Sequence, residues 1–86
     1  MEANFLWRYW ESDGYAVSDD SKWLLIRTYR NQLLTRCDWT QLVDAPLAPE
    51  EMEQWRIYRQ ALRDMPENYA NPSEAIFPTP PKGEII

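Results

Sequence analysis

The sequence reads PEEMEQWRIYRQALRDMP from Pro49 to Pro66, and this stretch decides the fold. Proline is favoured at the first position of a helix, and the two following glutamates suit the positive end of the helix dipole. Pro66 cannot continue a helix, so the pattern predicts a helix over residues 49–65. Its apolar side chains cover a wider arc than one neighbouring helix would need. They are Met52, Trp55, Tyr58, Leu62 and Met65, widened by Ile57 and Ala61. The rest of this arc must be covered by the N-terminal arm, the C-terminal tail or a second protein.

A second helix is predicted upstream, over residues 19–36. Ser18 can cap its N-terminus, and Asp19 and Asp20 suit its first turn. Apolar residues from Trp23 to Cys37 recur on one side of this helix. We therefore expect a mainly α fold in which residues 18–66 form an antiparallel helical hairpin. Residues 38–47 are its ordered connection.

The two ends of the chain differ in character from this hairpin. Residues 1–17 form an aromatic arm in which Ser12-Asp13-Gly14 is prone to turn, so we expect a β-hairpin or an extended arm. Residues 67–86 contain four prolines, and we expect an extended tail without helix. A chain of 86 residues is sufficient for one small domain, so residues 1–86 are expected to fold as a single unit.

Two arginines fall inside the apolar arcs of the predicted helices. Arg30 and Arg59 would be strongly unfavourable there unless each met a carboxylate, a row of carbonyls or an aromatic face. Asp38 and Asp44 are the nearest acids, because both lie on the connection. Our hypothesis is that the two arginines clamp the connection through these acids. The alternative is that they bind an anionic group of a ligand.

Composition excludes several classes of function. The chain has no histidine and one cysteine, Cys37, so it cannot build a Ser-His-Asp site, a Cys/His zinc site or an internal disulfide. Its acids lie mostly at helix ends or on polar faces, and it has no phosphate-binding glycine pattern. We therefore expect no enzyme activity, no cofactor, no metal and no small-molecule substrate.

Charge and hydropathy narrow the choice of partner. A net charge of −5 argues against nucleic acid, since binding to phosphates depends on clustered basic residues. No apolar run approaches the roughly 20 residues of a membrane span, and the start lacks a signal-peptide pattern. We expect a soluble cytoplasmic protein with no membrane partner.

A series of short motifs follows in a fixed order from the first predicted helix to the tail. The motifs are Arg30, Leu33-Leu34, Asp38-Trp39, Asp44-Ala45-Pro46-Leu47, Trp55, Tyr58-Arg59-Gln60-Ala61-Leu62-Arg63-Asp64 and Phe77-Pro78-Thr79-Pro80-Pro81. In this order and spacing, residues 22–81 resemble the tail assembly chaperones and tail-fibre assembly proteins of tailed bacteriophages. Cys37 and Ala48 depart from the usual pattern of such proteins, and the aromatic arm lies outside the shared region.

The resemblance implies a non-enzymatic protein that binds a phage tail or tail-fibre protein in the host cytoplasm and promotes its folding or attachment. One alternative is a structural subunit retained in the virion tail, baseplate or tail-fibre complex. Another is a small acidic phage protein that binds a host protein. Aromatic side chains dominate many protein interfaces, so we expect the partner to contact the arm and the tail. The expected contact residues are Trp7, Tyr9, Trp10, Tyr15, Ile76 and Phe77.

Overall fold

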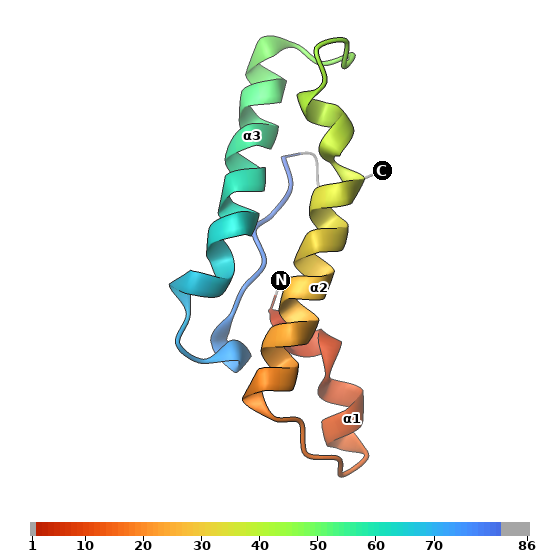
Figure 1. The fold of residues 1–86 in the computed structure, drawn as a ribbon, viewed down its shortest axis with the longest axis vertical. Coiled ribbons are helices and arrows are strands. Elements are labelled where there is room, and N and C mark those ends of the chain that lie inside the picture. The colour runs from red at the N-terminus through yellow and green to blue at the C-terminus, as the bar shows by residue number, and fades with distance from the viewer. Residues whose placement is uncertain (1, 82–86) are drawn as a thin grey trace.

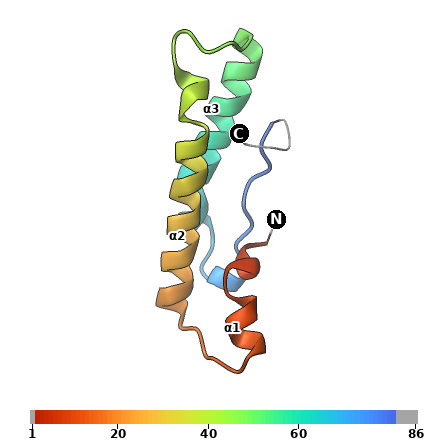
Figure 2. The ribbon, with the colours of Figure 1, turned by 90° about the vertical axis from the view of Figure 1, so that its right-hand side faces the viewer.

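The computed structural model describes residues 2–81, and this part of the chain is mainly helical, as expected. The two long helices, α2 and α3, lie side by side and run in opposite directions (Figure 1). A turned view shows the C-terminal segment running along one side of this pair (Figure 2). The elements in chain order are η1 (Ala3–Leu6), α1 (Arg8–Ser12), α2 (Asp19–Arg36), η2 (Asp38–Gln41), α3 (Pro49–Asp64), η3 (Met65–Asn68) and η4 (Pro72–Glu74), where η denotes a 3-10 helix.

The ends of the long helices follow from local side chains. At the start of α2, the Ser18 hydroxyl accepts a hydrogen bond from the Ser21 backbone N–H at 3.2 Å. Ala48 precedes α3 and has no capping group, but the Glu51 carboxylate accepts from the Ala48 N–H at 3.4 Å. This contact supplies half of a capping box. The predicted bounds of both helices therefore agree with the structure within one residue.

The expectation of a β-hairpin or an extended arm at the N-terminus is wrong. Residues 2–81 contain no strand, and the arm instead forms η1 and α1. Its two fully buried residues are Ala3, which lies in η1, and Trp7, which lies at the junction between η1 and α1, so the arm packs on the core as two short helices. Gly14, at a φ of +92°, turns the chain after α1 and does not join two strands.

The tail is extended only in part, since η4 and the end of η3 lie within the region expected to contain no helix. Pro72 begins η4, and the Asn71 side chain caps it by accepting from the Ser73 N–H at 2.9 Å. The arm and the tail then meet, because the Ala3 N–H donates to the Ala75 carbonyl at 2.9 Å. Residues 82–86 of the expected tail lie outside the described residues.

The arm and the tail both contribute to the hydrophobic core. The rings of Phe5, Tyr29 and Phe77 meet, with Tyr29 centred 5.1 Å from each of the other two. Apolar surface of both long helices is thus covered within the chain itself. The buried core consists of Ala3, Trp7, Ile26, Leu33, Cys37, Trp55, Tyr58, Leu62, Met65, Ala75 and Phe77. Over residues 2–81, no helix is both long and apolar enough to cross a membrane.

Candidate partner-binding surface

Arg59 joins α3 to the end of α2. Its Nη1 donates to the Leu34 carbonyl at 2.8 Å and to Cys37 Sγ at 3.2 Å, and its Nη2 donates to Asp38 Oδ1 at 2.8 Å. Burial lowers the pKa of the guanidinium, but the hydrogen bonds to Cys37 and Asp38 and the negative charge of Asp38 outweigh burial and raise the pKa above its ordinary value. The Arg59 side chain therefore stays charged and fixes the start of the connection.

Arg30 and Asp44 do not take part in this contact. Arg30 donates to the Asn31 side-chain oxygen at 3.2 Å and 3.0 Å, and to the Arg63 carbonyl at 3.5 Å. Arg63 lies in the last turn of α3, where the helix dipole stabilises a positive charge. Asp44 is exposed, and within residues 2–81 neither Arg30 nor Asp44 forms an ion pair. Of the four residues of the proposed clamp, the structure pairs only Arg59 with Asp38.

Lys22 makes a set of contacts that sequence reasoning missed. Its Nζ lies 3.3 Å from Glu11 Oε2, 3.3 Å from Ser73 Oγ and 5.2 Å from the centre of the Trp7 ring. These contacts connect α2 with the arm and the tail. The signal in the sequence is the spacing, since Lys22 precedes the buried Ile26 by four residues and so shares its face of the helix.

The six aromatic and apolar residues expected to contact a partner divide into two groups. Trp7 and Phe77 are only 1% and 2% exposed, because both fill the core. They offer no surface in this conformation, which corrects the expectation for these two positions. The other four are largely exposed, namely Tyr9 at 73%, Trp10 at 49%, Tyr15 at 67% and Ile76 at 48%.

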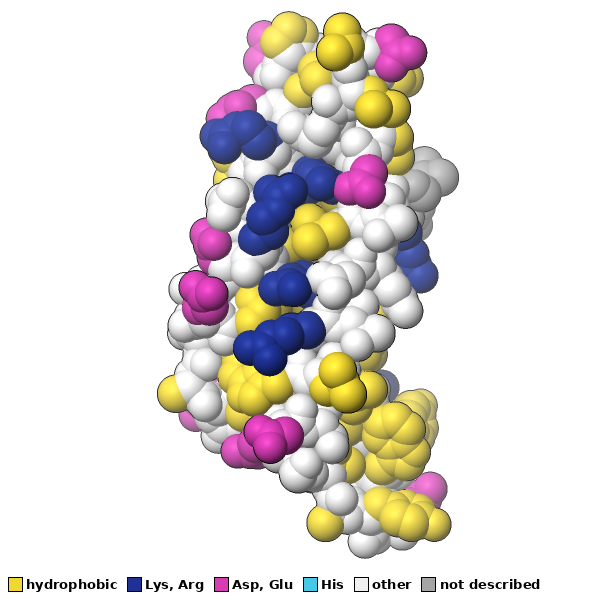
Figure 3. All heavy atoms as spheres, in the orientation of Figure 1, with side chains coloured by type: hydrophobic (Ala, Val, Ile, Leu, Met, Phe, Trp, Pro, Cys, Tyr) yellow, Lys and Arg dark blue, Asp and Glu magenta, His cyan; other side chains and the backbone are white. Residues whose placement is uncertain are grey.

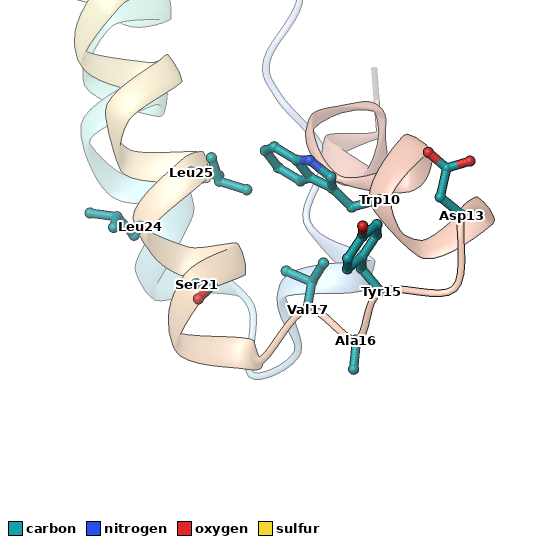
Figure 4. A pocket seen from close by; sticks show the side chains of 8 residues that line it. All are labelled: Trp10, Asp13, Tyr15, Ala16, Val17, Ser21, Leu24 and Leu25. Carbon is teal, nitrogen blue, oxygen red and sulfur yellow. The ribbon is translucent and has the colours of Figure 1, made fainter.

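A groove of about 700 Å³ lies between α1, the turn after it and the first half of α2. The Trp10 ring and Leu25 face each other across the groove, and Val17 points into it (Figure 4). Hydrophobic side chains also gather at this end of the molecule in the space-filling view (Figure 3). The lining residues are Trp10, Asp13, Tyr15, Ala16, Val17, Ser21, Leu24 and Leu25.

The chemistry of this groove is that of apolar binding. Trp10, Tyr15 and Leu24 are exposed, and they lie outside the hydrophobic core. Among the described residues that line the groove, Asp13 alone carries a charge. Over the described range 2–81, no group of three His, Cys, Asp or Glu residues could hold a metal ion. The groove can therefore accept an apolar side chain or a short apolar segment, with Trp10 as the largest contact.

Comparison with known proteins assigns the chain to a family. The family model for phage tail assembly chaperone protein matches residues 23–82, which include most of α2, all of α3 and the tail up to Lys82. The arm and the first residues of α2 precede the match. No curated protein matches the chain, and no solved structure does. Because the family model matches well over half of the sequence, the chain belongs to the phage tail assembly chaperone family.

Proposed function

We propose that this chaperone binds an apolar segment of a phage tail or tail-fibre protein in the groove between α1 and α2. It acts in the host cytoplasm during assembly and without catalysis. The observation that carries the proposal is the groove itself, in which Trp10, Tyr15 and Leu24 remain exposed although the fold buries Trp7 and Phe77. Membership of the family supports a phage protein as the partner.

The size of the groove is consistent with reversible binding. Burial of apolar surface contributes about 25 cal/mol per Å², so each 100 Å² or so of newly covered surface would contribute about 2.5 kcal/mol. Association costs several kcal/mol of lost translational and rotational freedom, which offsets much of this gain. A chaperone that covers exposed apolar surface and later releases its client needs such moderate affinity. A subunit retained in the virion would be expected to use a larger and more permanent interface.

The position of the groove supports a role in choosing the client. Residues 10–21 of the lining precede the part of the chain that the family model matches. The matched part holds the Arg59 contact and most of the core. We therefore assign the framework to the shared part and client recognition to the arm.

Co-expression with each tail and tail-fibre protein of the phage tests this proposal. The variants are Trp10→Ser, in the groove, and Tyr9→Ser, the matched control on the same helix but outside the lining. We expect the parent and Tyr9→Ser to keep a client soluble and to co-purify with it, whereas Trp10→Ser loses both properties. Circular dichroism melts must show that both variants keep the fold. Equal loss of the client in both folded variants would overturn the assignment to the groove.

A second measurement separates the chaperone from a retained subunit. If the protein is released after assembly, an immunoblot of purified virions will contain no band at 10.3 kDa. A band in a fixed ratio to the tail proteins would overturn the release step. Capture of a host protein in place of any phage protein would overturn the choice of client.

A further inference from the structure

Five arginines lie along the face where α2 and α3 meet. Arg56, Arg59 and Arg63 recur every three or four residues on α3, so they share one side of that helix. Arg27 and Arg30 are three residues apart on α2, and Arg30 reaches the Arg63 carbonyl. The space-filling view shows basic side chains in a row along this face (Figure 3). We call these five residues the arginine row.

Only part of the arginine row is neutralised within the described structure. Arg56 pairs with Glu53 at 2.6 Å, and Arg59 pairs with Asp38. For residues 2–81, no carboxylate lies within ion-pair distance of Arg27, Arg30 or Arg63. Within the part of the chain that the structure describes, three arginines without a carboxylate partner thus lie close together, although the net charge of the chain is −5.

The arginines without a carboxylate are held in place by other contacts. Arg30 uses three of the five N–H groups of its guanidinium on Asn31 and Arg63, and the other two donate to no group among residues 2–81. The Arg27 guanidinium lies 5.9 Å from the centre of the Trp23 ring, a cation–π contact. Partly ordered guanidinium groups lose less conformational freedom when they bind a carboxylate.

We propose that the arginine row binds an acidic peptide segment carrying at least two carboxylates. Arg27 and Arg30 are separated by less than one helical turn, about 5–6 Å between their Cβ atoms. Carboxylates two positions apart on an extended peptide lie about 6.6 Å apart, so they match this separation. The row is distinct from the groove. It gives the protein a second binding surface, which is positively charged where the groove is apolar.

The observations favour a peptide over nucleic acid. Three free arginines would neutralise few phosphates, whereas affinity for nucleic acid grows with the number neutralised. The remaining surface is acidic overall, and the whole chain has 14 acidic residues against 9 basic residues. A long polyanion would be repelled by this surface, but a short acidic segment could bind the row alone.

Nuclear magnetic resonance titration of the full chain with a peptide of four Asp alternating with Gly tests the proposal. We expect the Nε signals of Arg27, Arg30 and Arg63 to shift. These shifts should disappear in about 0.5 M NaCl, because salt screens the attraction between exposed charges. The double variant Arg27→Gln/Arg63→Gln should weaken binding at least about threefold, which is typical for two exposed charges.

Arg36→Gln is the matched control. Arg36 is an exposed arginine of α2 that shares a face with Thr28 and Gln32, away from the row. This control should bind the peptide as the parent does, and so should Trp10→Ser. Equal weakening by Arg36→Gln, or shifts scattered over the molecule, would overturn the proposal. Tighter binding of an oligo-dT strand than of the peptide at the same salt concentration would overturn the choice of a peptide.

Discussion

Replacing Arg59 by alanine tests how the helical pair is held to its connection. The Arg59 side chain is 10% exposed and donates to the Leu34 carbonyl and to Asp38. The hydrogen bond to the partly buried Leu34 carbonyl contributes about 1 kcal/mol. The pair with Asp38 contributes about 1 kcal/mol or less, because the Asp38 side chain is 63% exposed and solvent screens the pair. Loss of the packed aliphatic stem brings the expected total to about 2–3 kcal/mol.

The structure also predicts an asymmetry between the two partners. Asp38→Ala should cost about 1 kcal/mol or less, since Arg59 keeps its bond to the Leu34 carbonyl. Asp44→Ala should change stability by less than about 0.5 kcal/mol, as expected for an exposed residue outside any ion pair among residues 2–81. Urea unfolding followed by circular dichroism measures all three variants. The reasoning is refuted if Arg59→Ala costs less than about 0.5 kcal/mol, or if Asp38→Ala costs as much as Arg59→Ala.

Three further predictions concern the core, a helix end and pH. Trp7→Ala should lower the free energy of unfolding by about 3–5 kcal/mol, because it removes a ring that is 1% exposed; a thermal melt close to that of the parent would contradict this. Ala48→Ser should raise stability by about 0.5–1 kcal/mol in urea unfolding, since its hydroxyl can accept from an N–H of the first turn of α3, which Ala48 cannot do; no gain would contradict this. Burial raises the pKa of Tyr58 from 10.0 to about 12, so the folded state holds a proton that the unfolded state loses in this range. This contribution to the free energy of unfolding is fully present below pH 10, and the free energy falls by about 2 kcal/mol as the pH rises toward 12. Tyr58→Phe should reduce this fall, which urea unfolding at successive pH values measures.

The two long helices were predictable because their signals are local. Ser18 caps α2, and Pro49 and Pro66 bracket α3, so neither assignment depends on distant contacts. The mainly α fold class and the family are both confirmed. Both were predictable because they depend on motifs within and between these helices. The pairing of Arg59 with Asp38 follows from the cost of a charge on an apolar face.

The arm was not predictable from its own residues. Its conformation depends on contacts with distant parts of the chain, above all Trp7 beneath Lys22 and Ala3 bonded to Ala75. A segment of about ten residues has too few repeats to separate a helical period from a strand period. The groove depends on the same distant contacts, so the cavity between α1 and α2 could not be predicted, and contact of Trp10 and Tyr15 with a partner stays a prediction.

Hydrogen exchange of the protein with and without its co-purified client tests the central claim most directly. If the groove receives the client, backbone amides of residues 8–25 will gain protection in the complex, while those of α3 will change little. Protection confined to α3, with residues 8–25 exchanging as fast as in the free protein, would contradict the assignment of client binding to the groove.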